Sequence, residues 1–90
     1  MADNNSDNKQ TMGVKIYAPF KTYFDAPAVS LSAINQTGPF DILPRHKNFM
    51  SLLQPCTIIV RQQHGEPFSM RVTRGVMHVK ADRVTVFLDV

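Results

Sequence analysis

The sequence predicts an all-β domain, a small antiparallel β-sandwich of about 8–10 short strands. Hydrophobic and polar residues alternate with a period of two in several segments, as in strands that bury one face. No long segment between them has a helical pattern. Prolines interrupt most windows that are long enough for a stable helix, and they occur at Pro19, Pro27, Pro39, Pro44, Pro55 and Pro67.

Two strands are predicted in the first third of the chain, over residues 14–18 and 29–33. Every second residue in each is apolar, and the residues between them include lysine, tyrosine and serine. The expected core positions are Val14, Ile16 and Ala18 in the first strand, and Val29, Leu31 and Ala33 in the second.

The second half of the chain predicts two hairpins. Residues 62–67 contain Gly65 and Pro67 and are expected to form the loop of the first hairpin. Ala81 and Asp82 are expected to form the turn of the second. The strands on either side should direct inward Cys56, Ile58 and Val60; Phe68, Met70 and Val72; Met77 and Val79; and Val84, Val86 and Leu88.

One segment, His46 to Leu53, does not have the period of a strand. Its apolar residues Phe49, Met50, Leu52 and Leu53 are compatible with one helical turn, and the prolines on either side keep that turn short. We therefore expect at most a single turn of helix here.

Composition predicts one folded domain, residues 13–90, preceded by a disordered polar tail, residues 1–12. Hydrophobic residues make up 43% of the chain and charged residues 19%, which excludes a wholly disordered protein. The opening residues resemble neither a secretory nor an organelle-targeting signal. With a single cysteine, Cys56, no intrachain disulfide can form, so a cytoplasmic location is expected.

Side chains that could perform catalysis are scattered along the sequence. Cys56 opens an apolar strand, and nothing in the sequence brings His46 close to it as a base. The three histidines lack the spacing of metal ligands, and the glycines form no phosphate-binding loop. We expect no catalytic residue, no metal and no cofactor.

The net charge is +3, and the densest basic cluster is Arg45-His46-Lys47. Single-strand nucleic acid binders combine a basic groove with exposed aromatic rings. Here Phe40, Phe49, Phe68 and Phe87 lie in apolar contexts, so nucleic acid is not the expected partner.

Several blocks of the sequence match one set of motifs in the same order. Gly38 to His46 (GPFDILPRH) is similar to G-x-F-G-I-L-P-G-H, and residues 51–55 (SLLQP) are similar to L-x-P. Gly75 to Val79 (GVMHV) is similar to G-G-F-L-E-V, and residues 83–89 (RVTVFLD) are similar to R-V-T-V-L-A-D. With these motifs the chain resembles the epsilon subunit of F-type ATP synthases, called delta in mitochondria. In this frame Gly38 opens a tight turn, Ile42 and Leu43 are expected in the core, and Pro44 ends a strand.

The chain departs from the family pattern at three positions. Asp41 and Arg45 stand where the family usually has glycine, and Arg74 replaces the first glycine of the G-G pair. The helical hairpin that follows the sandwich in this family would begin after Val90. Nothing about that hairpin's role carries over to this chain.

The resemblance implies a non-catalytic rotor subunit of the central stalk, which links the gamma subunit to the c ring and couples proton or sodium transport to ATP synthesis or hydrolysis. It would lie on the inner face of a bacterial cell membrane as part of the complex and bind no small-molecule substrate. The residues expected to contact the c ring are Asn35, Gln36, Thr37, Gly38, Arg45 and His46. The alternative is a free-standing β module that binds nucleic acid or another protein.

Overall fold

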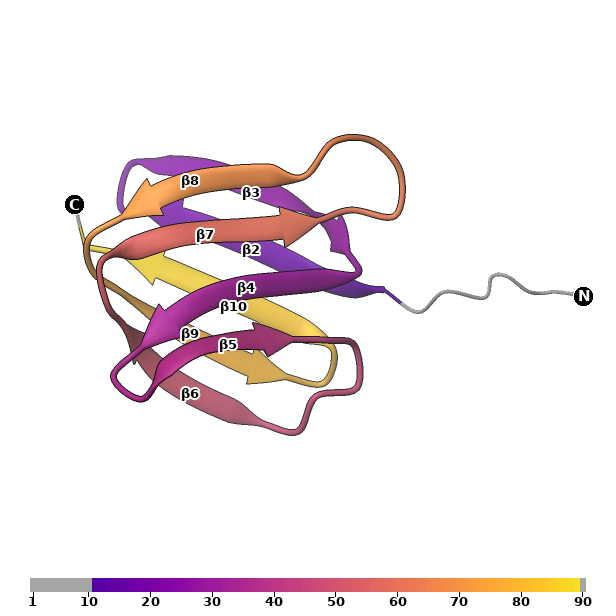
Figure 1. The fold of residues 1–90 in the computed structure, drawn as a ribbon. Helices are drawn as coiled ribbons and strands as arrows, with labels where there is room; N and C mark the ends of the chain where they lie inside the picture. Colours follow the sequence, from indigo (N-terminus) through magenta and orange to yellow (C-terminus); the bar gives the residue numbers. More distant parts are fainter. Residues whose placement is uncertain (1–10, 90) are drawn as a thin grey trace, which may run out of the picture.

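The computed structural model describes residues 11–89, which form nine strands and no helix (Figure 1). The described residues thus contain no helix that is long and apolar enough to cross a membrane. The strands are β2 (Met12–Ala18), β3 (Lys21–Ala28), β4 (Ser30–Asn35), β5 (Gly38–Ile42), β6 (Phe49–Leu53), β7 (Cys56–Arg61), β8 (Phe68–Val72), β9 (Gly75–Lys80) and β10 (Arg83–Leu88).

The strands form two facing layers. The first layer has the order β3-β2-β10-β9-β6, and the second has β5-β4-β7-β8. One paired position between β4 and β6, Asn35 with Leu53, joins the layers into a single curled sheet. The two-layer all-β prediction is confirmed.

One pair of strands differs from the predicted antiparallel arrangement. β10 lies parallel to β2, with Val84 opposite Val14 and Val86 opposite Ile16, whereas the other pairs are antiparallel. The chain leaves the first layer after β3, returns to it for β6, and returns again for β9 and β10 after β7 and β8 of the second layer. Strands from the two ends of the chain can therefore lie side by side in the same direction.

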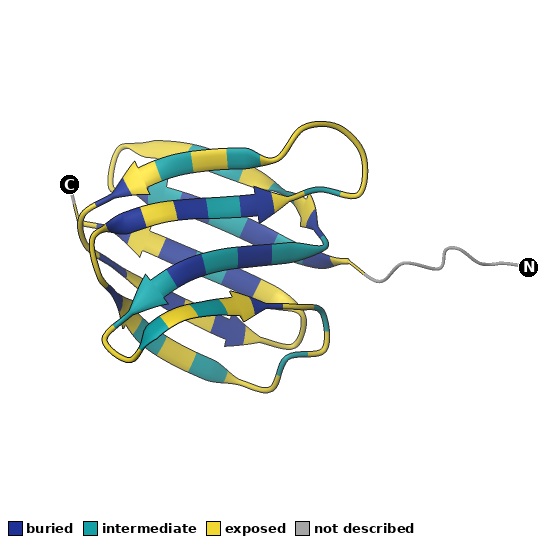
Figure 2. Ribbon diagram, viewed as in Figure 1, coloured by how far each residue is buried: buried dark blue, intermediate teal, exposed yellow. Residues whose placement is uncertain are grey.

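The core fills the space between the layers. Buried and exposed residues alternate along the strands (Figure 2), as the period of two predicts. No polar or charged residue is buried in the part of the chain that the structure describes. Among the fully buried side chains are Val14, Ile16, Leu31, Ile42, Ile58, Val60, Met77, Val79, Val84, Val86 and Leu88. Burial of each stabilises the fold by about 1.5–3 kcal/mol relative to exposure.

Four expectations from the sequence are wrong in detail. Met12 is predicted to belong to the disordered tail, but it is buried as the first residue of β2 because it continues the apolar alternation. Residues 1–10 of the predicted tail lie outside the described residues. Val29 is half-buried at the bend between β3 and β4. Leu43 follows the end of β5 and is 55% exposed. Residues 49–53 form the strand β6, because pairing with β9 satisfies their backbone.

The sandwich has two ends that present different loops (Figure 1). At one end, which we call the Asp82 end, lie the β9–β10 turn, the loop 43–48 and the loop 62–67. At the opposite Thr37 end lie the β4–β5 turn and the turns 19–20, 54–55 and 73–74. Each loop lies at the end of the sandwich toward which the preceding strand runs.

Candidate interaction surfaces

The β4–β5 turn holds four of the six residues predicted to contact a partner, Asn35, Gln36, Thr37 and Gly38. Asn35 Oδ1 accepts hydrogen bonds from the Thr37 backbone N–H at 2.9 Å and from Thr37 Oγ1 at 2.7 Å. Gly38 has a φ of +123°, which side chains rarely adopt. The turn is thus fixed in shape and directs Gln36 and Thr37 into solvent.

Arg45 and His46 lie at the Asp82 end, separated from that turn by the whole of β5. Four residue steps of strand put Gly38 and Ile42 roughly 13 Å apart. Arg45 donates its backbone N–H to Asp82 Oδ1 at 2.5 Å, in the β9–β10 turn. The structure therefore does not bring the six predicted residues together, and they form two groups at opposite ends.

His46 packs against the edge of β6. Its ring lies edge-on to Phe49, with the centroids 5.5 Å apart. The Nδ1 atom lies 2.8 Å from the carbonyl oxygen of Lys47, which can only accept, so Nδ1 is the donor. These contacts hold the imidazole against the protein.

The outer face of the first layer carries a row of apolar side chains. Leu52 of β6 is opposite Val76 of β9, Val76 is opposite Phe87 of β10, and Phe87 is opposite Tyr17 of β2. Leu52 is 68% exposed and Phe87 38%, and the Tyr17 and Phe87 rings meet edge-on at 5.2 Å. We call these four residues the apolar row. Contiguous exposed apolar surface of this kind marks interaction sites.

Sequence reasoning missed the apolar row. The sequence places Phe87 in an apolar context, yet its side chain points away from the core and is 38% exposed. The available signal was that Tyr17, Val76 and Phe87 occupy positions that the alternation of their strands directs outward. Their alignment into one row depends on pairing between strands.

The outer face of the second layer has a different character, because small polar residues dominate it. Ser32 Oγ donates to Asp41 Oδ1 at 2.6 Å, and Arg61 Nη1 donates to Ser32 Oγ at 3.2 Å. This chain of hydrogen bonds connects β5, β4 and β7. Polar side chains here bond to one another, so this face is a weaker candidate for an apolar partner.

The residues considered for chemistry stay apart. Cys56 is buried at the Thr37 end of β7, whereas His46 lies at the Asp82 end. Within residues 11–89, no group of three histidine, cysteine or acidic residues could hold a metal ion.

Comparison with known sequences gives a match over almost the whole chain. A family model described as the ATP synthase delta/epsilon chain β-sandwich domain matches residues 11–90. The ATP synthase epsilon chain of Sulfurovum sp. (strain NBC37-1) is 24% identical over 80 residues, 89% of this chain and 62% of that protein. The ATP synthase epsilon chain of Synechococcus sp. (strain PCC 6716) is 32% identical over 78 residues, which make up 87% of this chain and 56% of that protein. The chain spans about three fifths of these relatives' lengths.

Comparison with solved structures finds the same fold. A chain in the cryo-EM structure of the Tetrahymena thermophila mitochondrial ATP synthase central stalk and c ring superposes with a TM-score of 0.77 at 19% identity, covering 89% of this chain and 64% of that one. A chain of the Euglena gracilis mitochondrial ATP synthase gives a TM-score of 0.80 at 15% identity, covering 87% and 50%.

Proposed function

Because the chain belongs to the family of ATP synthase delta/epsilon β-sandwich domains, we propose that it is a rotor subunit of the central stalk. In this role it links the gamma subunit to the c ring, so that proton or sodium transport is coupled to ATP synthesis or hydrolysis. It is structural and catalyses no step itself. It lies on the cytoplasmic side of the cell membrane, held there through the complex.

The packing of the domain suits the transmission of torque. A core as dense as an organic crystal deforms little under load. Two layers share that core, and the Asn35–Leu53 pairing and the hydrogen bond between Arg45 and Asp82 connect them at opposite ends. Two partners bound to different parts of the surface would therefore move as one body with the domain.

The apolar row is the observation that carries the proposal, and we assign it to the gamma subunit. It crosses four neighbouring strands of one layer, so it offers a continuous surface. Met50, 67% exposed, lies one outward position from Leu52 on β6 and extends the surface. Apolar side chains at the centre of an interface, surrounded by polar residues, provide most of the affinity in stable complexes.

The β4–β5 turn is the surface we assign to the c ring. Asn35, Gln36, Thr37 and Gly38 form a polar, rigid projection at the Thr37 end, and polar contacts of this kind fix register more than affinity. Arg45 and His46 cannot share that contact, since they lie at the other end of β5. The proposal thus keeps four of the six residues for the c ring.

A binding experiment with the purified gamma subunit tests the apolar row. We expect the chain to elute with gamma from a size-exclusion column, and Leu52→Asp to weaken the complex about 30-fold or more, because a charge would be buried in the interface. Leu43→Asp is the matched control, since Leu43 is also an exposed leucine but lies in the loop 43–48. Equal binding by both variants, or salt-dependent binding to oligonucleotides without binding to gamma, would overturn the proposal.

Coupling in the assembled synthase tests the c ring contact. Gln36→Trp places a large side chain at the β4–β5 turn and should lower proton pumping per ATP hydrolysed. Lys47→Trp, an equivalent change at the Asp82 end, should leave pumping intact. The reverse pattern would assign the c ring contact to the Asp82 end.

A further inference from the structure

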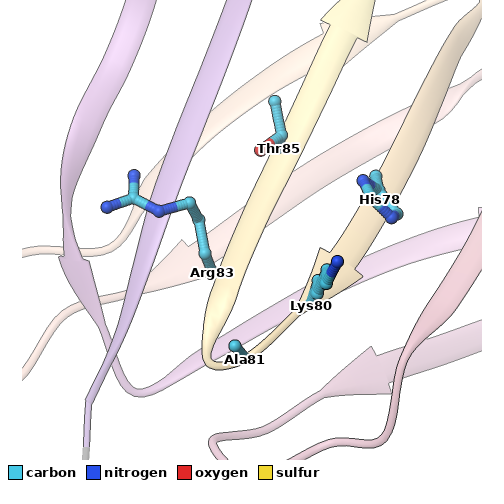
Figure 3. A pocket seen from close by; sticks show the side chains of 5 residues that line it. All are labelled: His78, Lys80, Ala81, Arg83 and Thr85. Carbon is cyan, nitrogen blue, oxygen red and sulfur yellow. The ribbon is translucent and has the colours of Figure 1, made fainter.

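A shallow hollow opens on the outer face of β9 and β10, close to the Asp82 end (Figure 3). Its volume is about 330 Å³, and it is lined by His78, Lys80, Ala81, Arg83 and Thr85. It lies on the same face as the apolar row but further along the strands, toward the β9–β10 turn. It is thus a separate feature of this face.

The lining of the hollow is rich in donors. Lys80 is opposite Arg83, and His78 is opposite Thr85, so the four polar side chains form two adjacent rows across the hairpin. Figure 3 shows Lys80 directed toward His78 and Arg83 extending to the other side, toward β2, with Thr85 further along β10. Lys15 is opposite Thr85 on β2, but its ammonium lies 5.0 Å from the centre of the Tyr17 ring, and Asp25 is its neighbour on β3. It is therefore not counted among the donors of the hollow.

No carboxylate lines the hollow. Asp82 is the acidic residue nearest to it in sequence, and its Oδ1 accepts the Arg45 backbone N–H. Gly13, opposite Arg83 on β2, has no side chain, and a Cβ there would meet nothing within 4 Å. The guanidinium therefore has open space in which to turn toward a ligand.

The charge on the lining of the hollow is positive, because Lys80 and Arg83 carry it and none of the lining residues is acidic. A concave surface with one sign of charge concentrates ions of the opposite sign.

We propose that the hollow binds the phosphate groups of an anion. The Lys80 ammonium acts as a point charge, and the Arg83 guanidinium donates two parallel hydrogen bonds to one phosphate. Thr85 donates through its hydroxyl and His78 through a ring N–H. A phosphate group presents enough oxygens for donors on several sides, whereas one carboxylate presents two. Free oligophosphates and phospholipid headgroups share this chemistry.

Titration of the 90-residue chain with pyrophosphate, followed by NMR of the backbone amides, tests the proposal without any partner protein. We expect saturable shifts confined to residues 78–85, weakened by added salt. Lys80→Ala/Arg83→Ala should weaken binding about tenfold or more, because two charge-assisted contacts are lost. Lys21→Ala/Arg71→Ala removes the same charge elsewhere and should change it less than about twofold.

A second arm distinguishes the source of the phosphate. Phosphatidylcholine vesicles with and without phosphatidylglycerol are sedimented with the same variants. Binding of pyrophosphate alone indicates a free oligophosphate, and binding only to vesicles with phosphatidylglycerol indicates a lipid headgroup. Three outcomes would overturn the proposal. The chain could bind a poly-glutamate peptide but neither phosphate probe, or it could bind none of the probes. The two double variants could also lose the same amount of affinity for phosphate. None of these outcomes bears on the rotor proposal.

Discussion

Asp82 Oδ1 accepts a hydrogen bond from the backbone N–H of Arg45 at 2.5 Å, and both residues have left-handed backbone conformations, with φ of 59° and 69°. Arg45 lies in the loop after β5 of the second layer, and Asp82 in the β9–β10 turn of the first. The bond therefore connects the two layers at the Asp82 end. Left-handed conformations cost most residues about 1–2 kcal/mol, so Arg45 is strained, whereas aspartate is one of the residue types that tolerate this conformation.

Arg45→Gly should stabilise the domain. Glycine adopts a φ of 69° without strain, but it also has more conformational freedom in the unfolded chain. The free energy of unfolding should therefore rise by only about 0.5–1 kcal/mol. Arg45→Ala is the control, because alanine keeps the strain while losing the contacts of the arginine side chain. Urea unfolding measures both variants. Equal stabilities for the glycine and alanine variants would show that the backbone strain is not relieved.

Substitutions at Asp82 separate the hydrogen bond from the charge. Asp82→Asn keeps an oxygen acceptor and a residue type that tolerates a left-handed backbone, so the free energy of unfolding should change by less than about 0.5 kcal/mol. Asp82→Ala loses the acceptor and should cost about 1–2 kcal/mol. Urea unfolding of the two variants at one pH is the measurement. If asparagine costs as much as alanine, the carboxylate charge is the stabilising feature instead.

The alternation of apolar residues was enough to predict which side chains form most of the core. Val14, Ile16, Ile58 and Val86 are buried as expected, since a period of two assigns a face without knowledge of the neighbouring strand. The segment Phe49–Leu53 could not be assigned this way. Two adjacent pairs of apolar residues obscure the period, and only the pairing with β9 shows that Met50 and Leu52 point outward.

The candidate surfaces were less predictable, because they depend on contacts between distant parts of the chain. Tyr17 and Phe87 are 70 positions apart in sequence and meet only because β10 lies parallel to β2. Arg45 and Thr37 are near in sequence, yet β5 separates them. The replacement of a family glycine by Arg45 was visible in sequence, and its consequence, a strained left-handed residue, required the backbone geometry.

Gly75 and Gly13 should respond in opposite ways to alanine. A Cβ at Gly75 would lie 2.9 Å from the Phe87 carbonyl oxygen and 3.0 Å from Leu88 Cδ2, so Gly75→Ala should destabilise the fold by about 1–3 kcal/mol. A Cβ at Gly13 meets nothing within 4 Å, and Gly13→Ala should be neutral or stabilise by up to about 1 kcal/mol. Thermal or urea unfolding compares them. Similar losses in both would mean that strand pairing, not the close approach to Phe87, decides the effect.

Phe24 and Phe68 close the side of the sandwich where the layers are not joined by backbone pairing. Their ring centroids are 4.8 Å apart, and they belong to β3 and β8, the outermost strands of the two layers on that side. A double-mutant cycle with Phe24→Leu and Phe68→Leu should give a coupling energy of about 0.5–1.5 kcal/mol, measured by urea unfolding. The same cycle with Phe24 and Phe49, which lie on opposite sides of the sandwich, should give none. Additive losses for Phe24 and Phe68 would mean that each ring is held by its own layer, and that contact between the rings does not stabilise the closed side.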